Sequence, residues 1–235
     1  DQSLGLYVKE ALEYKNKGFN AWKFRPSTPK GLDHFQRNKM PPPVDIQAIQ
    51  QTIKDVSKAC GDEFEILLDV GCRCRDINET LELCDFAADY NIGFIEEPLT
   101  RDIGLYKELI SKVKVGISTG ETFFSSEQFE IWAKNSAIDI FQPDVNLVGV
   151  REAIKVLEIA EKYDKKIVFH NWANAISNIA NISVASSSPE ICTYVESSIV
   201  YNPFRKSLIK NPVISENGIF RLLDNPGLNA DMIIR

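Results

Sequence analysis

The chain has 235 residues, 44% of them hydrophobic, so it is long enough for one sizeable core and short for two ordinary domains. Its 27 basic and 33 acidic residues give a formal net charge of −6, which disfavours binding to nucleic acid or to an anionic membrane. Its longest apolar runs are only a few residues long, far below the length of a membrane-spanning helix.

Short apolar runs alternate with stretches of helical periodicity along the chain. In chain order the pattern predicts helix 3–17, strand 19–24, helix 44–60, strand 64–70, helix 78–90, strand 93–95, helix 105–113, strand 115–119, helix 125–135, strand 137–141, helix 150–163, strand 166–169, helix 176–186 and strand 191–195. Residues 26–43 are polar and proline-rich, which predicts a long loop.

Two local patterns give more specific predictions about these helices. Ser125 and Gln128 have the spacing of a capping box, which predicts the start of the helix that ends near residue 135. Val150, Ile154 and Leu157 have helical spacing and predict the stripe of their helix that faces the core.

The alternation of apolar strands and helices predicts an α/β domain over residues 1–235, with a parallel sheet covered on both faces. The seven units have the length typical of a (β/α)8 TIM-type barrel, and the missing first strand would precede Ser3. A doubly wound open sheet is the alternative. The lack of a glycine-rich phosphate loop after the first strand disfavours it.

Ionisable side chains recur where the predicted strands end, which in a barrel is the end that carries chemistry. These residues are Lys23 and Arg25, Asp69, Glu96, Glu121, Asp144, His170 and Glu196. The sequence therefore predicts a site built from several strand ends.

Three successive strands each contribute one acid: Asp69, Glu96 and Glu121. On one rim these carboxylates could not all stay ionised without a cation. Oxygen ligands with no His or Cys among them favour Mg²⁺ over zinc. The alternative is that each acid only caps a strand end or begins a helix.

Asp144 and His170 are also one unit apart. Neighbouring strand ends would let Asp144 accept a hydrogen bond from the imidazole and raise its basicity. The alternative is a structural histidine with satisfied hydrogen bonds. The second histidine, His34, falls in the predicted loop and is expected to be solvated.

Lys23 and Arg25 are two residues apart on one strand, so both point to the same face. We expect them to hold a substrate carboxylate and its developing negative charge. The alternative is an internal ion-pair network without chemistry. Arg25 is a poor proton acceptor because its pKa is about 12 or higher.

The five cysteines, an odd number, are typical of reduced cytosolic thiols, so a cytoplasmic protein is expected. Only Cys72 and Cys74 lie close together, and they are a weak zinc candidate. The chain begins at Asp1 without an initiator Met or a charged-then-apolar leader, so we expect a piece of a longer product.

The joint order of these motifs resembles the enolase superfamily, in particular the acid-sugar dehydratases of its mandelate racemase subgroup. The resemblance covers residues 18–228, and its motifs are Lys-x-Arg, Asp69, Ile-Glu-Glu-Pro, Gly-Glu, Gln-Pro-Asp and His-Asn-Trp. It implies a barrel preceded by an N-terminal capping domain, and we expect this chain to lack that domain and the first strand.

The resemblance also implies the activity and the roles of the residues. Asp69, Glu96 and Glu121 would bind Mg²⁺. His170, oriented by Asp144, would remove the proton α to the carboxylate of an aldonate or aldarate and then protonate the departing β-hydroxyl. Glu196 would hydrogen-bond the substrate carboxylate. The product would be a 2-keto-3-deoxy acid, which makes the protein a hydro-lyase.

Two positions depart from the family pattern. Arg25 stands where many members of the subgroup have a lysine base, which argues against a racemase and for a dehydratase with one base. Gly71 stands where an asparagine is frequent, two residues after Asp69. A racemase or epimerase of a 2-hydroxy acid and a non-catalytic barrel are the alternatives. The expected partners are a sugar acid and further copies of the chain, since barrels of this kind commonly form homo-oligomers.

Overall fold

The computed structural model describes residues 2–26, 42–197, 202–213, 215–224 and 226–233. The chain forms two compact units, Asp1–Ser118 and Thr119–Arg235. Most of the predicted loop at 26–43, with His34, lies outside the described residues. No described helix is both long enough and apolar enough to cross a membrane.

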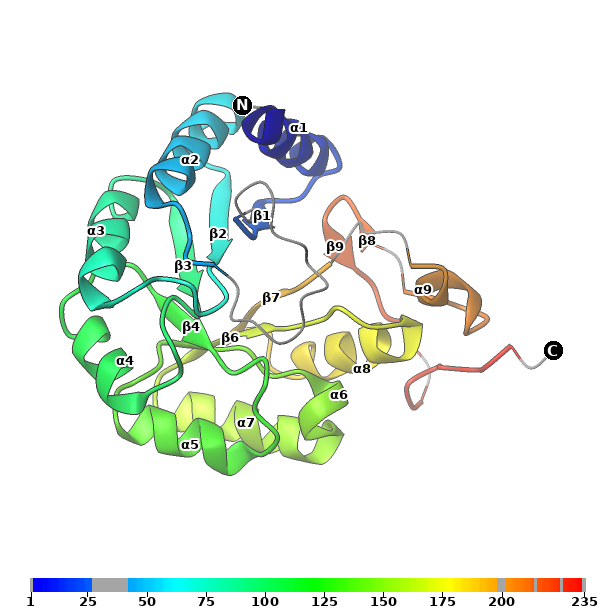
Figure 1. The fold of residues 1–235 in the computed structure, drawn as a ribbon. Helices are drawn as coiled ribbons and strands as arrows, with labels where there is room; N and C mark the ends of the chain where they lie inside the picture. The colour runs from blue at the N-terminus through cyan, green and yellow to red at the C-terminus, as the bar shows by residue number, and fades with distance from the viewer. Residues whose placement is uncertain (1, 27–41, 198–201, 214, 225, 234–235) are drawn as a thin grey trace. The chain divides into compact units, whose positions relative to one another are not determined.

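The first unit is a parallel β/α arrangement. In chain order it contains α1 (Gln2–Asn16), β1 (Ala21–Phe24), α2 (Ile46–Cys60), β2 (Glu65–Asp69), α3 (Ile77–Ala87), β3 (Ile92–Glu96), α4 (Ile103–Ile110) and β4 (Ile117–Thr119), the last at its boundary. Each strand pairs in parallel with the next, and α2, α3 and α4 follow one another along the outer side of the strands (Figure 1).

The second unit continues the same alternation. It contains α5 (Ser126–Lys134), β5 (Ile140–Phe141), α6 (Val145–Val148), α7 (Val150–Lys162), β6 (Lys166–Phe169), α8 (Ala175–Ala185) and β7 (Cys192–Val195). Strands β5, β6 and β7 pair in parallel. The seven parallel strands that the sequence predicts are therefore present.

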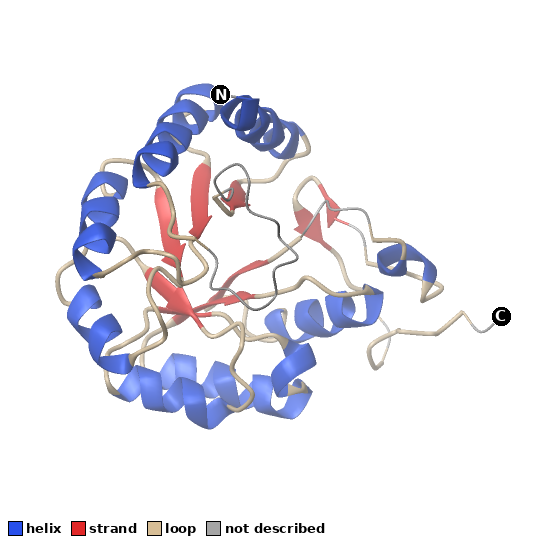
Figure 2. Cartoon of the chain, viewed as in Figure 1, coloured by secondary structure: helices blue, strands red, loops and turns tan. Residues whose placement is uncertain are grey.

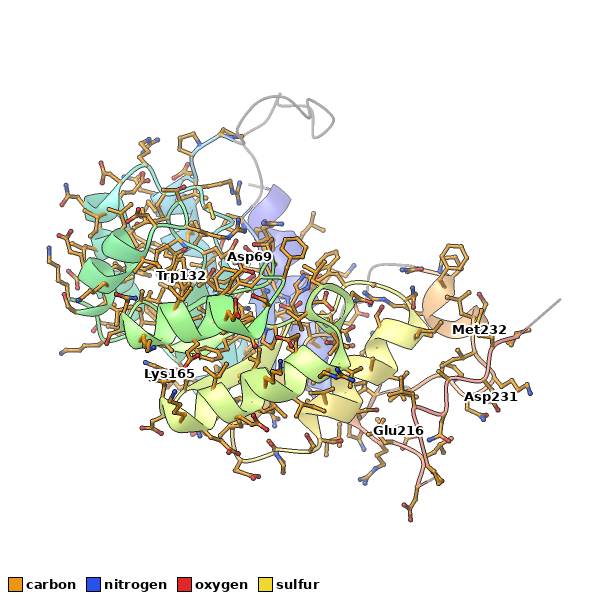
Figure 3. The ribbon with its side chains drawn as sticks, turned by 90° about the horizontal axis from the view of Figure 1, so that it is seen from below. Asp69, Trp132, Lys165, Glu216, Asp231 and Met232 are labelled. Atoms are coloured by element: carbon orange, nitrogen blue, oxygen red, sulfur yellow. The ribbon has the colours of Figure 1, made fainter. Side chains whose placement is uncertain are left out.

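A C-terminal segment follows that the sequence pattern did not predict. It contains α9 (Phe204–Ser207) and the antiparallel pair β8 (Ser215–Glu216) and β9 (Ile219–Phe220), which Figure 2 shows as a pair of short red strands at the right of the view. Glu216, Asp231 and Met232 lie on this segment, away from Lys165, the residue before β6 (Figure 3).

The parallel strands are buried over consecutive residues. Leu68 on β2, Ile95 on β3, Ile117 on β4 and Phe169 on β6 are fully buried, and so are residues before or after them on the same strands. Adjacent strand residues point to opposite faces, so both faces of the strands are covered. This confirms the predicted α/β class.

Side-chain caps set the starts of several helices. Asp45, Asp76, Asp102 and Asn174 each accept hydrogen bonds from the first turn of the helix that follows, an arrangement that stabilises a helix by about 1 kcal/mol. Because Asp102 caps Leu105 N–H, α4 begins two residues before the predicted start at residue 105.

Two local predictions are only partly confirmed. Ser125 is the N-cap of α5, so the helix begins where predicted, but Ser125 makes no side-chain cap hydrogen bond, and Gln128 Oε1 accepts from Phe124 N–H at 2.7 Å instead. On α7, Val150 and Ile154 are 42% and 46% exposed. The buried face of α7 runs through Ala153, Val156, Leu157 and Ala160. Its alanines allow close packing, so the core stripe includes small residues that a search for large apolar side chains passes over.

Candidate active site

Two of the predicted acids lie next to each other in the first unit. Asp69, which is labelled in Figure 3, is the last residue of β2, and Glu96 is the last residue of β3. The two residues are direct partners in the parallel register. Asp69 is 8% exposed and Glu96 is fully buried. Val70 N–H donates to Glu96 C=O at 2.9 Å, so the pairing extends past the end of β2. The two carboxylates therefore project from one end of adjacent strands.

Each of these carboxylates faces a cation from the end of β1. Lys23 Nζ forms an ion pair with Glu96 Oε2, and Arg25 Nε lies 3.3 Å from Asp69 Oδ2. The Lys23 side chain is 17% exposed and the Arg25 side chain 59% exposed. The structure thus brings together the four predicted site residues of the first unit.

The remaining predicted residues lie in the second unit, where three neighbouring strand ends run side by side. The backbone N–H of His170 donates to the Pro143 carbonyl at 3.1 Å, and the backbone N–H of Glu196 donates to the Phe169 carbonyl at 3.0 Å. Asp144, His170 and Glu196 therefore follow β5, β6 and β7 at the same edge.

Asp144 and His170 form the predicted dyad. His170 Nδ1 lies 2.8 Å from Asp144 Oδ2, a hydrogen bond that leaves Nε2 as the outer ring nitrogen. Nε2 lies 3.4 Å from Glu121 Oε2. One imidazole thus joins the orienting carboxylate to a predicted metal ligand.

Asp144 is held in place by more than His170. It is the N-cap of α6, and its Oδ1 accepts from Asn146 N–H at 2.9 Å and from Asn181 Nδ2 at 3.3 Å. Burial by itself would raise the pKa of the Asp144 carboxyl, but the hydrogen bonds from His170, Asn146 and Asn181 outweigh it and lower the pKa. Asp144 is therefore an ionised acceptor.

The environment of His170 makes its imidazole more basic. Burial by itself would lower the pKa of His170. The hydrogen bond to Asp144 and the negative charges of Glu196 and Glu121 outweigh burial and raise it. A raised pKa increases the proton affinity of Nε2, which suits a general base.

Glu196 also contacts the His-Asn-Trp segment. Its Oε2 accepts from Asn171 N–H at 3.2 Å, and its backbone carbonyl accepts from Asn171 Nδ2 at 2.9 Å. Asn171 is 4% exposed. This pairing fixes β7 to the residue that follows His170.

The predicted metal ligands are divided between the units: Asp69 and Glu96 are in the first, and Glu121 is in the second. Among the described residues, no group of three His, Cys, Asp or Glu side chains is arranged to hold a metal ion. The three-carboxylate site stays a prediction. Cys72 and Cys74, the weak zinc candidate, likewise belong to no such group among the described residues, and burial raises the pKa of the Cys74 thiol to about 11.

A family model described as enolase C-terminal domain-like matches residues 6–233. The chain belongs to this family. The resemblance to the enolase superfamily that the motifs indicated is therefore confirmed.

Individual relatives of the chain carry the names of sugar-acid enzymes. It is 25% identical to a D-gluconate/D-galactonate dehydratase from Picrophilus torridus, over 94% of this chain and 55% of that protein. It is 26% identical to a D-galactarolactone cycloisomerase from Agrobacterium fabrum, over 77% of this chain and 50% of that protein. The chain thus spans about half the length of the curated relatives it matches.

A solved structure gives the same result for the fold. The crystal structure of the 3,6-anhydro-D-galactonate cycloisomerase from Zobellia galactanivorans superposes with a TM-score of 0.82 at 26% identity. The match covers 97% of this chain and 60% of that one. The arrangement of strands and helices is therefore that of an enolase-superfamily C-terminal domain.

Two buried charged residues next to the family motifs escaped the sequence analysis. Glu97 is 1% exposed, and its carboxylate accepts two hydrogen bonds from Arg101, at 2.6 and 2.5 Å. Arg73 is 6% exposed and donates to backbone carbonyls. The spacing of Glu97 and Arg101, four residues apart, is a signal that could have indicated the first pair. No sequence pattern indicates the burial of Arg73.

Proposed function

We propose that this chain forms the barrel part of a Mg²⁺-dependent acid-sugar dehydratase, which converts an aldonate or aldarate into a 2-keto-3-deoxy acid. The observation that carries the proposal is the dyad, in which Asp144 orients His170 at 2.8 Å and Nε2 is directed toward Glu121. The dehydratase name of the Picrophilus relative supports the reaction class.

His170 is the proposed base. Asp144 accepts the Nδ1–H and so keeps Nε2 unprotonated and able to take the proton α to the substrate carboxylate. The bonding pair of that C–H bond forms the enediolate. When the enediolate collapses, the β-carbon–oxygen bond breaks and Nε2–H returns its proton to the departing hydroxyl, so that water is released. Tautomerisation of the resulting enol gives the 2-keto acid.

The carboxylates fit a hard divalent cation by their chemistry. Asp69 and Glu96 offer oxygen ligands in adjacent register. We infer that Asp69, Glu96 and Glu121 would hold Mg²⁺. Bound there, Mg²⁺ would polarise the substrate carboxylate and acidify the α-proton.

The other site residues would bind and orient the substrate. Lys23 and Arg25 place positive charge beside the acids, which favours an anionic substrate. Glu196 would hydrogen-bond the substrate carboxylate. A guanidinium is a poor proton acceptor, so Arg25 would not supply a second base beside His170, which favours dehydration over racemisation.

Cycloisomerisation is a second candidate, because the Agrobacterium and Zobellia relatives carry cycloisomerase names. A racemase or epimerase and a non-catalytic barrel are the remaining alternatives. We further infer a cytoplasmic homo-oligomer, which cell fractionation and analytical ultracentrifugation test.

A product assay separates these reactions. Purified protein with Mg²⁺ is incubated with a library of aldonates, aldarates and their lactones, and products are read by ¹H NMR. The proposal expects a 2-keto-3-deoxy acid from at least one aldonate or aldarate. Ring opening or closure without loss of water would identify a cycloisomerase, and inversion of one stereocentre an epimerase. No conversion of any compound, together with no calorimetric signal for Mg²⁺, would identify a non-catalytic barrel.

A further inference from the structure

Arg25 carries an exposed cation at the end of β1. Its side chain is 59% exposed, whereas that of Lys23 is 17% exposed. Its Nε lies 3.3 Å from Asp69 Oδ2, so one edge of the guanidinium is directed toward that carboxylate. A guanidinium has five N–H donors in a planar fork, and it can therefore hold Asp69 and bind another anion at the same time.

Gly71 leaves the space in which this guanidinium lies. A Cβ atom at position 71 would lie 3.1 Å from Arg25 Nε and 3.2 Å from Cζ, and closer still to Nη2. Gly71 also has a φ of +63°, which glycine adopts without steric strain. A side chain at position 71 would push the guanidinium away from Asp69.

The backbone on both sides of this contact is fixed by Arg73. Its Nε donates to Val70 C=O at 3.0 Å, beside Gly71, and its Nη2 donates to Pro26 C=O at 2.7 Å, just after Arg25. Burial and the positive charge of Arg25 lower the pKa of Arg73, consistent with two neighbouring guanidinium groups. Because these backbone segments are tied together, a steric conflict at position 71 is relieved by movement of the flexible Arg25 side chain.

We propose that Gly71 is a positioning residue for substrate binding, because its missing side chain fixes the Arg25 guanidinium beside Asp69, where the exposed donors bind a carboxylate of the substrate. The chemical class of this ligand, a sugar acid, rests on the proposed function. Gly71 would then act through Arg25 as a positioning residue, without touching the substrate itself.

Calorimetric titration with D-gluconate, in Mg²⁺ and again in EDTA, tests this proposal. We expect Gly71→Ala to weaken gluconate binding at least about fivefold, as Arg25→Ala does. Gly61→Ala is the matched control, because Gly61 has a similar φ of +79° but nothing within 4 Å of its added Cβ. It should bind gluconate like the wild type.

The double variant Arg25→Ala/Gly71→Ala separates a shared mechanism from two independent ones. If Gly71 acts through Arg25, the double variant binds gluconate no more weakly than Arg25→Ala alone. Three results would overturn the inference. The first is equal gluconate affinity of Gly71→Ala and Gly61→Ala, and the second is an additive loss of affinity in the double variant. The third is that the wild type binds no gluconate in either buffer. Absence of Mg²⁺ binding would overturn the proposed function alone, since the comparison in EDTA still decides the role of Gly71.

Discussion

The two carboxylate oxygens of Asp144 have different partners, one in the local fold and one in the candidate catalytic dyad. Its Oδ1 caps α6 through Asn146 N–H, and its Oδ2 lies 2.8 Å from His170 Nδ1. A residue with two such partners cannot turn away from either one without losing a buried hydrogen bond. The cap therefore helps to hold the carboxylate in the orientation that the imidazole requires.

Replacement of Asp144 by asparagine separates these two roles. An asparagine still accepts the cap hydrogen bonds, so the unfolding midpoint should change little. It lacks the negative charge that orients the His170 imidazole and stabilises its protonated form. We therefore expect kcat for dehydration to fall by roughly 10²–10⁴-fold. Steady-state kinetics and thermal unfolding of the same preparation measure both effects.

Asp102→Asn is the matched control for this substitution. Asp102 caps α4 by accepting from Leu105 N–H at 2.9 Å, just as Asp144 caps α6. The control should keep the kcat of the wild type. A similar fall in kcat for both variants would mean that Asp144 acts only through the stability of a helix end.

At the scale of elements, the segments that follow β2 and β3 are joined beyond the sheet. Cys72 N–H donates to Glu97 C=O at 2.5 Å, and Cys74 N–H donates to Pro98 C=O at 3.0 Å. Arg101, two residues before α4, donates two hydrogen bonds to the buried Glu97 carboxylate. These contacts tie the chain after Asp69 to the chain after Glu96.

Removal of the Arg101 guanidinium should destabilise this connection. In Arg101→Met the carboxylate of Glu97, whose side chain is 2% exposed, stays buried without its bidentate donor. We expect a loss of about 3 kcal/mol in the free energy of unfolding, measured by urea denaturation. Arg75→Met breaks a pair with the same four-residue spacing to Glu79, but the Arg75 side chain is 64% exposed. Arg75→Met should lose less than about 1 kcal/mol in the free energy of unfolding. Equal losses for the two variants would contradict this account.

The corrected orientation of α7 gives a second prediction at this scale. Leu157→Ala should reduce the free energy of unfolding by about 2–4 kcal/mol, because Leu157 is 4% exposed and its removal leaves a cavity. Ile154→Ala should reduce it by less than about 1 kcal/mol, because Ile154 is 46% exposed. Urea denaturation of the two variants measures both values, and a larger loss for Ile154→Ala would restore the orientation expected from the sequence.

For the whole molecule, the sequence pattern predicted the parallel strands and the longer helices but not the shortest elements. Apolar runs such as the one ending at Asp69 identified all seven parallel strands, because burial on both faces leaves a continuous pattern. Helix α6 was missed, since four residues after Asp144 carry no periodicity. The α9 and β8–β9 segment was missed for the same reason.

The candidate site was predictable where it depends on strand ends. Asp69 beside Glu96, and Asp144 beside His170, follow from parallel pairing, which brings successive strand ends to one edge. The burial of Arg73 and the space that Gly71 leaves for Arg25 were not predictable, because both depend on contacts between residues of different strands. Tertiary packing, rather than local pattern, decides such details.

The central claim is that His170 removes the substrate α-proton. Its most direct test follows the α-proton of the aldonate or aldarate that the product assay identifies, by ¹H NMR in D₂O with Mg²⁺, for the wild type and for His170→Asn. The account predicts loss of the α-proton signal and formation of a 2-keto-3-deoxy acid with the wild type, and neither with His170→Asn. Equal rates of α-proton loss in the two proteins would contradict it.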